Sequence, residues 1–297
     1  MSVVIKSDNI ANNYFGTSKM LGTTPEIEFQ TYKSRVLADG GLIKDEERTL
    51  RAFKLLFNAK MYGNMNTAVS GTFGVKLNSS GGIQKLYSLD GYDLIGVVYG
   101  NGTLPTLDSS NNISFAANDP AQNTDGAIFT TASKIIMSKV GNFGFATCVK
   151  DFGDTTAVRR LAGLTKHNDV VNTSTISNLV TLPGTGEVVW NVHADPLSLT
   201  TSNNSEDVRV NVSSYNYPMI SFLTVPGLSQ KFGSRSGSEM TMPTGKTFME
   251  ITTEDFYIDF GGTILSNIKY FSKATVKDFM CFNQATREQS TLLSTFI

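Results

Sequence analysis

The sequence predicts a mainly β protein of the sandwich type, with a pair of helices near its start. From Thr67 onward, short segments alternate apolar and polar residues, and the turn dipeptides Asp-Gly, Asn-Gly and Gly-Gly separate them. Charged residues make up 17% of the 297 residues, below the roughly 25% usual in soluble domains, and Ser, Thr, Asn and Gly take their place. Before Thr67, apolar residues recur at three- and four-residue spacing, which predicts helices instead.

The two helices are expected to form a hairpin. Thr24 suits the N-cap of the first helix, with Pro25 at its first position, and Asp39-Gly40-Gly41 ends it. The second helix starts near Asp45, and Gly63 stops it. The apolar stripes that must be buried are Phe29, Tyr32 and Val36 in the first helix and Leu50, Phe53, Phe57 and Met61 in the second.

The strands follow the helices and carry the predicted sandwich. Residues 172–187 and 198–207 are polar and turn-rich, which predicts exposed loops. We therefore expect two parts: residues 1–66, with an entry strand and the helical hairpin, and residues 67–297, with the sandwich and a short C-terminal helix. The expected strands are Phe73–Leu77, Leu86–Leu89, Ile135–Met137, Phe143–Val149, Val188–Val192, Val208–Val212, Ile220–Leu223 and Phe256–Ile258, and the entry strand is Val3–Ile5.

The segment Asp259–Met280 closes the predicted sandwich. After a glycine pair, an alternating strand places Ile264, Ile268 and Tyr270 on one face, where they are expected to join the core. Thr275 then opens a predicted helical turn.

Charge and cysteine content exclude several classes of function. The net charge is −1 and no run of Lys and Arg exists, which argues against a nucleic-acid partner. No apolar run reaches the ~18 residues of a membrane span, and the N-terminus lacks a secretory layout. Cys148 and Cys281 form no CxxC pair, so two buried thiols are favoured over a disulfide, as in a protein made in a reducing cytoplasm.

Two segments carry a resemblance to a known fold family. In Ile113–Asp151, the alternating Phe143 and Phe145 precede Cys148 and Val149, and Asn267–Ala274 reads as a strand, an aromatic pair and an alanine. Both segments resemble concanavalin A-like (laminin G-like) modules. The resemblance covers roughly residues 67–280 and implies a jelly-roll sandwich.

The N-terminal helices resemble a different group. Their sequence is similar to the helical lead-in of tailed-bacteriophage virion proteins. The match is partial, because Leu42-Ile43 follows the glycine pair where those proteins commonly have an aromatic or acidic residue. The resemblance implies a non-enzymatic structural component of a virion, such as a capsid decoration, collar, tail or baseplate accessory. Such a protein would be made in the host cytoplasm and assemble with other virion proteins and with copies of itself. The matching residues are Arg35, Val36, Ala38, Asp39, Gly40 and Gly41.

The two histidines give little support for catalysis. A Ser-His-Asp triad needs one positioned imidazole, and His193 precedes Asp195-Pro196 at a strand end. A turn at His193 and a loop at His167 are the favoured interpretations. Neither histidine has the spacing of a zinc site, so no metal centre is predicted.

A glycosidase is the second alternative function, since enzymes of this fold use paired carboxylates. Glu250, Glu254 and Asp259 come closest to such a pair, but Thr252 stands where the alternation needs a carboxylate. A solvated strand edge is the favoured interpretation.

Binding of a host glycan is the first alternative function, in host adhesion. Tyr215 and Tyr217 lie beside Asn216, which suits a carbohydrate-binding surface, although buried or interface tyrosines would read the same way. No cofactor is predicted, and the one candidate is a calcium ion at the rim of the sandwich. Its ligands would be Asp119, Asp125 and Asp151.

Overall fold

The computed structural model gives the fold in most of the chain. It describes residues 22–116, 125–136, 143–152, 159–165, 167, 175–182, 184–193, 205–212, 218–225, 230–235, 238–240, 255–265 and 268–296. The predicted entry strand Val3–Ile5 lies outside these residues.

The helical hairpin is confirmed. Helix α1 (Pro25–Ala38) starts after Thr24, whose hydroxyl accepts a hydrogen bond from the Ile27 amide at 3.3 Å. Helix α2 (Glu46–Asn58) starts after Asp45, whose carboxylate accepts from the Arg48 amide at 2.8 Å. The predicted stop at Gly63 is wrong, because the α2 helix already ends at Asn58.

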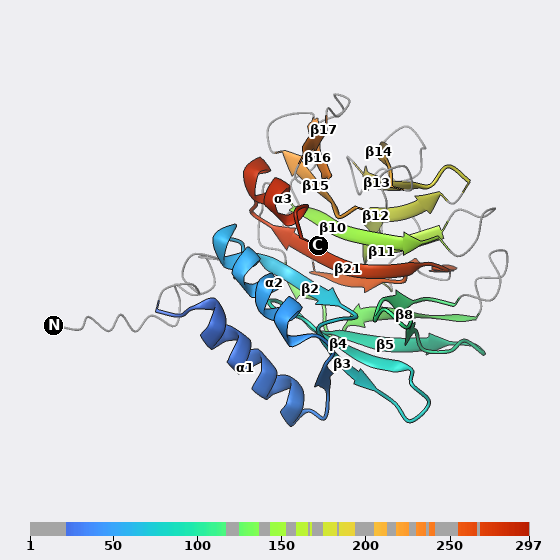
Figure 1. Ribbon diagram of the computed structural model, residues 1–297. Coiled ribbons are helices and arrows are strands. Elements are labelled where there is room, and N and C mark those ends of the chain that lie inside the picture. Colours follow the sequence, from blue (N-terminus) through green and yellow to red (C-terminus); the bar gives the residue numbers. More distant parts are fainter. Residues whose placement is uncertain are drawn as a thin grey trace.

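Within the described residues, an 11-stranded antiparallel sheet, sheet A, forms one layer (Figure 1). Strand β9 (Ile135–Ile136) pairs with β18 further along the strand from β8, where the sequence predicts a strand. The other strands, in spatial order, are β1 (Leu42–Ile43), β3 (Gly74–Leu77), β4 (Ile83–Tyr87), β5 (Leu94–Tyr99), β8 (Gly126–Thr131), β18 (Asp255–Phe260), β11 (Arg159–Thr165), β12 (Thr175–Leu182), β13 (Glu187–His193) and β14 (Ser205–Asn211).

Sheet B has eight strands in the described residues and forms the second layer. Strand β2 (Met65–Ser70) pairs with β21 beside the main path. The path is β17 (Ser238–Met240), β16 (Gln230–Arg235), β15 (Ile220–Val225), β10 (Phe143–Asp151), β21 (Thr275–Asn283), β7 (Ile113–Ser114) and β6 (Thr106–Leu107).

The main core lies between the two sheets. Phe260 of sheet A stacks on Phe279 of sheet B, with ring centroids 4.5 Å apart and planes within 6°. Both rings are fully buried and belong to one continuous apolar cluster. The predicted fold class, a mainly β jelly-roll sandwich with a helical hairpin, is therefore confirmed.

A second core lies on the outer side of sheet B, under the helices (Figure 1). Strand β21 serves both cores, because Phe279 and Cys281 face sheet A while Met280 and Phe282 face the helices. Helix α3 (Arg287–Leu293) is the short C-terminal helix, and its Ser290 hydroxyl lies 2.6 Å from that of Ser221.

The closing segment differs from its prediction in two ways. The single expected strand is a hairpin of β19 (Gly262–Leu265) and β20 (Ile268–Phe271). Thr275, expected to open a helical turn, begins strand β21 instead. Ile264 is buried as predicted, but in a small cluster with Ile128 and Phe271 outside the main core.

The two loop predictions are wrong in part. Strand β12 occupies residues 175–182, within the predicted loop 172–187, and pairs with strands on both sides. Strand β14 begins at Ser205, inside the predicted loop 198–207. The division of the chain at residue 66 stays a prediction.

Both cysteines are free and buried, as predicted. Burial raises the pKa of the Cys148 thiol to about 11 and that of Cys281 to about 12. Neither thiol is therefore an activated nucleophile.

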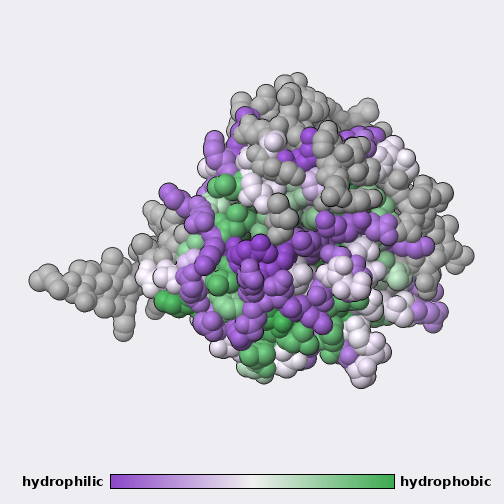
Figure 2. Space-filling view, viewed as in Figure 1, coloured by the Kyte–Doolittle hydropathy of each residue, from purple (hydrophilic) through white to green (hydrophobic). Residues whose placement is uncertain are grey.

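Hydrophilic residues gather over α2 at the centre of the face drawn in Figure 2, and hydrophobic surface lies below it near the end of α1. Ile27, Leu37 and Leu42, in and just after α1, keep exposed fractions of 54%, 55% and 38%. None of the helices in the described residues has the length and apolar content needed to span a membrane.

Candidate functional site

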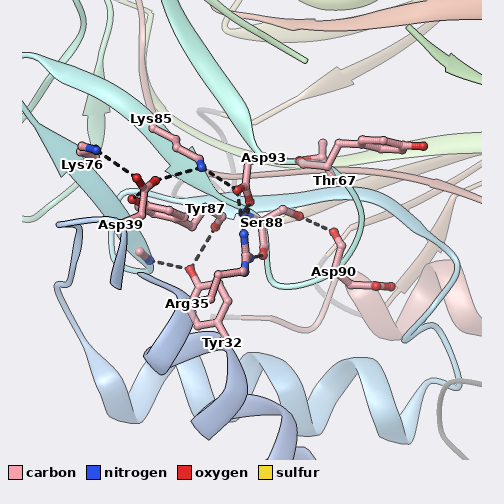
Figure 3. Close-up of polar contacts among 12 residues, drawn as sticks. Tyr32, Arg35, Asp39, Thr67, Lys76, Lys85, Tyr87, Ser88, Asp90 and Asp93 are labelled. Carbon is pink, nitrogen blue, oxygen red and sulfur yellow. Dashed lines mark hydrogen bonds and ion pairs between the residues drawn. The ribbon is translucent and has the colours of Figure 1, made fainter. Parts of the chain in front are cut away.

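A polar network joins α1 to strands β3 and β4 and to the connection between β4 and β5 (Figure 3). Two nitrogens of Arg35 reach out from the helix: Nη1 donates to both Asp93 carboxylate oxygens at 2.8 and 2.7 Å, and Nη2 donates to the Ser88 carbonyl at 2.7 Å. We call this network the helix clamp, and its members are Tyr32, Arg35, Asp39, Lys76, Lys85, Tyr87, Ser88 and Asp93.

Asp39 is the second anchor of the helix clamp. It accepts a hydrogen bond from the Tyr87 hydroxyl at 2.7 Å and pairs with Lys76 and Lys85 at 3.1 Å each. The Tyr87 bond, then the two lysines, lower the pKa of its carboxyl. The side chains of Asp39 and the two lysines are partly solvated, so each ion pair adds little stability.

The glycines of the Arg35–Gly41 motif complete the helix clamp. Gly40 has φ +73°, which favours glycine after the helix end. A Cβ on Gly41 would lie 2.5 Å from Cε2 of Tyr87, so only glycine lets the chain pass the ring. Because both acids of the clamp are paired with bases, its chemistry is that of a structural joint.

A buried ion pair fixes α2 to sheet B. Arg48 Nη1 and Nη2 donate to the two carboxylate oxygens of Asp278 at 2.9 and 2.8 Å. The hydroxyls of Ser70 and Thr72 also lie within 3.2 Å of Nη1. The side chains of Arg48 and Asp278 are 4% and 1% exposed, so this pair too is structural.

The candidate binding site lies on the outer face of sheet A, around Asp259 of β18. Its carboxylate is fully buried and accepts from the Thr165 hydroxyl at 2.7 Å and the Ile264 amide at 3.2 Å. The other carboxylate oxygen lies 2.8 Å from Nε2 of His167. We call Thr165, His167, Tyr257 and Asp259 the histidine centre.

His167 is held firmly although it lies beyond the end of β11. Its ring stacks flat on Tyr257, with centroids 4.0 Å apart and planes within 4°. Its backbone has φ +56°, an uncommon conformation for a residue other than glycine. Such conformations concentrate at functional sites, where surrounding contacts enforce them.

The histidine centre presents a defined chemical surface. With Nε2 donating to Asp259, a neutral imidazole leaves Nδ1 as an acceptor. The His167 side chain is 15% accessible, and Tyr257 is partly exposed. A triad would place a nucleophile at the free nitrogen, and no described residue does so.

Asp259 also acts on a neighbouring tyrosine. Burial, and secondly the charge of Asp259, raise the pKa of Tyr99 on β5. The Tyr99 phenol therefore stays neutral and able to donate a hydrogen bond at physiological pH.

The predicted site residues are dispersed or lie outside the described part of the chain. Asp259 is buried in the histidine centre and is no solvated strand edge, so that interpretation of it is wrong. Asp125 accepts from the Asn101 amide at 3.0 Å, and Asp151 ends β10. His193 ends β13. Tyr215, Tyr217, Glu250, Glu254 and Asp119 lie outside the described residues.

No three or more His, Cys, Asp and Glu side chains come together to hold a metal ion in the part of the chain that the structure describes.

Sequence reasoning missed the histidine centre. Its one local signal is spacing: Tyr257 and Asp259 stand two apart on a strand and share a face, as do Thr165 and His167 in extended chain. The pairing of β11 with β18, which brings the two segments together across 92 residues, has no local signal.

No protein family matches the sequence, and neither does any curated protein. Among solved structures, the chain is similar to the binding domain of botulinum neurotoxin serotype D (13% identity, TM-score 0.47), covering 77% of this chain and 51% of that one. It is also similar to the neurotoxin DC binding domain in complex with rat synaptotagmin II (12%, 0.48, 79% and 52%). A third is the Ruminococcus gnavus IT-sialidase CBM40 bound to α2,6 sialyllactose (8%, 0.41, 56% and 97%). The chain thus spans about half the length of the toxin domains, and likenesses this distant say nothing of its ligand.

Proposed function

We propose that the protein is a non-catalytic carbohydrate-binding module whose glycan packs against the histidine centre. The observation that carries the proposal is the flat stack of His167 on Tyr257, fixed by a buried carboxylate and partly accessible to solvent, with the His167 side chain 15% exposed. Host-glycan binding is the first alternative function that the sequence offers, and we place it at the histidine centre instead of at Tyr215 and Tyr217.

The chemistry of the centre suits a sugar. A sugar ring offers hydroxyl groups at its edge and C–H groups on its faces. The Tyr257 ring supplies an apolar surface and a hydroxyl, while Nδ1 of His167 accepts a hydrogen bond. Because Asp259 and the stack already hold the imidazole, little side-chain entropy is lost on binding.

We expect Tyr257→Ala to weaken glycan binding by about tenfold or more, because an aromatic contact contributes ~0.5–1.5 kcal/mol beyond its buried area. A glycan array would identify the ligand, and isothermal titration would measure the loss. Tyr257→Phe keeps the ring and should bind nearly as well. Tyr92→Ala, at a tyrosine that is 45% exposed, is the matched control and should bind as the natural protein does.

The outcomes separate three possibilities. Equal binding by the Tyr257→Ala and Tyr92→Ala variants would refute the histidine centre as the site. A loss confined to Tyr215→Ala or Tyr217→Ala would assign the glycan to the tyrosines that the sequence predicts. A natural protein with no array signal would refute the function itself.

We propose, as a second candidate, that the protein is a structural virion component that assembles through α1. The Arg35–Gly41 resemblance suggests this role, and the helix clamp fixes α1 while Ile27 and Leu37 stay exposed. A rigid helix with exposed apolar residues suits contact with another protein chain, most simply a second copy.

Sedimentation velocity tests this assembly. The natural protein should sediment as an oligomer at micromolar concentration, and Leu37→Lys should convert it to a monomer because a charge would be placed in the interface. Val98→Lys, at a position 42% exposed on β5, is the control and should leave the oligomer intact. A monomeric natural protein would contradict self-assembly.

A further inference from the structure

Arg160, in strand β11, is a charged side chain that contacts an aromatic ring and has a buried nitrogen without a hydrogen-bond partner. Its guanidinium lies over the Tyr270 ring of β20, with Cζ 3.9 Å from the ring centroid. The residue is only partly exposed, and its Nη1 atom is buried without a hydrogen-bond partner. Burial lowers the pKa of Arg160, yet a guanidinium stays charged at neutral pH.

No acid neutralises this charge among the described residues. Arg35 and Arg48, which are also partly or fully buried, each meet a carboxylate through two hydrogen bonds. The contact that the structure gives Arg160 is the Tyr270 ring. A largely buried cation without an anion destabilises the unliganded fold. A contribution to stability therefore does not account for Arg160.

Two hydroxyls nearby are also without partners. Thr263 stands directly opposite Tyr270 in the β19–β20 hairpin, is fully buried, and has no partner for Oγ1. Ser272, two positions after Tyr270, is 1% exposed and its Oγ also has none. Buried polar atoms are almost always hydrogen-bonded, so the three unpartnered atoms around Tyr270 leave hydrogen-bonding positions that a ligand can fill.

We infer that Arg160 binds the carboxylate of an acidic saccharide beside the β19–β20 hairpin. The Tyr270 ring covers one flat side of the guanidinium, so an anion approaches its edge, where a carboxylate forms two parallel hydrogen bonds. The single cation matches one negative charge. Lys269 precedes Tyr270 on β20, so its side chain points to the opposite face of the hairpin. Its ammonium lies over the Tyr99 ring and not beside Arg160.

That the ligand has a carboxylate is inferred from Arg160 alone. That the carboxylate belongs to a sugar rests on the proposed function. Arg160 and His167 lie at opposite ends of β11, so the two sites can be tested separately. The probe is methyl glucuronide, and methyl glucoside is the neutral match.

The natural protein should bind methyl glucuronide about tenfold or more tighter than methyl glucoside, measured by titration at low salt. Arg160→Gln should abolish the preference, and Arg160→Lys should retain part of it, since an ammonium lacks the planar fork. Arg51→Gln, at an exposed arginine of α2, should change nothing. No preference in the natural protein, or one that survives in Arg160→Gln, would overturn the inference.

Stability without ligand gives a second measurement. Arg160→Met removes an uncompensated charge and should hold or raise the melting temperature, whereas a structural arginine would lower it by several degrees. Such a fall would overturn the inference. A failure of the proposed function would look different: neutral glycans would fail to bind, or would bind independently of Tyr257.

Discussion

Asp278→Ala should lower the free energy of unfolding by about 3–5 kcal/mol, because it leaves the Arg48 guanidinium buried without its anion. The pair lies between α2 and β21, with both side chains under 5% exposed and two hydrogen bonds shorter than 3 Å. The Phe296 ring covers the guanidinium, with Cζ 4.3 Å from its centroid, which closes the site to water. Urea denaturation followed by circular dichroism measures the loss.

The matched variants test the physical cause. Arg48→Met combined with Asp278→Leu removes both charges, and such replacements are often neutral or stabilising by ~1–4 kcal/mol. The double variant should therefore be much more stable than Asp278→Ala alone. Lys54→Ala breaks the exposed pair with Glu26 and should leave the urea midpoint unchanged. A loss below about 1 kcal/mol in Asp278→Ala would contradict the burial of the pair.

This ion pair also shows what sequence reasoning cannot reach. The sequence predicts a helical turn that begins at Thr275, yet Asp278 stands in strand β21. The segment does not alternate, because β21 is covered by the main core on one side and by the helices on the other. A strand buried on both faces reads as a near-continuous apolar run, which periodicity cannot distinguish from a buried helix.

Local signals were sufficient for the helical hairpin. The caps at Thr24 and Asp45 involve contacts only three residues away; the Thr24 cap is formed as predicted, and α2 begins directly after Asp45, near which the sequence predicts its start. Strand β12, in contrast, is rich in Ser, Thr and Asn, a composition that predicts a loop. Its partners β11 and β13 supply its backbone hydrogen bonds, and that pairing overrides local propensity.

The histidine centre and Arg160 depend on the same long-range pairing. His167 meets Asp259, and Arg160 meets Tyr270, only because β11 lies beside β18 and the β19–β20 hairpin folds back over the sheet. The residues around His167 predict only a loop. Its role follows from the partner that the sheet supplies.

Trp190→Ala should destabilise the protein by about 3–5 kcal/mol, the usual result of truncating a large buried aromatic side chain. Trp190 stands on β13 of sheet A and is fully buried. Three rings of sheet B contact it: Phe143 and Phe145 meet it edge-on with centroids 5.9 and 6.4 Å away, and Phe222 lies 5.6 Å away. The side chain therefore joins the two layers where sheet A carries its last strands.

Trp190→Phe is the control, since it keeps an aromatic ring in the same site and should lose less than half as much stability. Because the chain has one tryptophan, unfolding of both variants must be followed by circular dichroism. Hydrogen exchange would show whether β12 to β14 open before the rest of the sheet in Trp190→Ala. A loss under about 1 kcal/mol would contradict the shared core, because a tryptophan packed between two sheets cannot be removed without leaving a cavity.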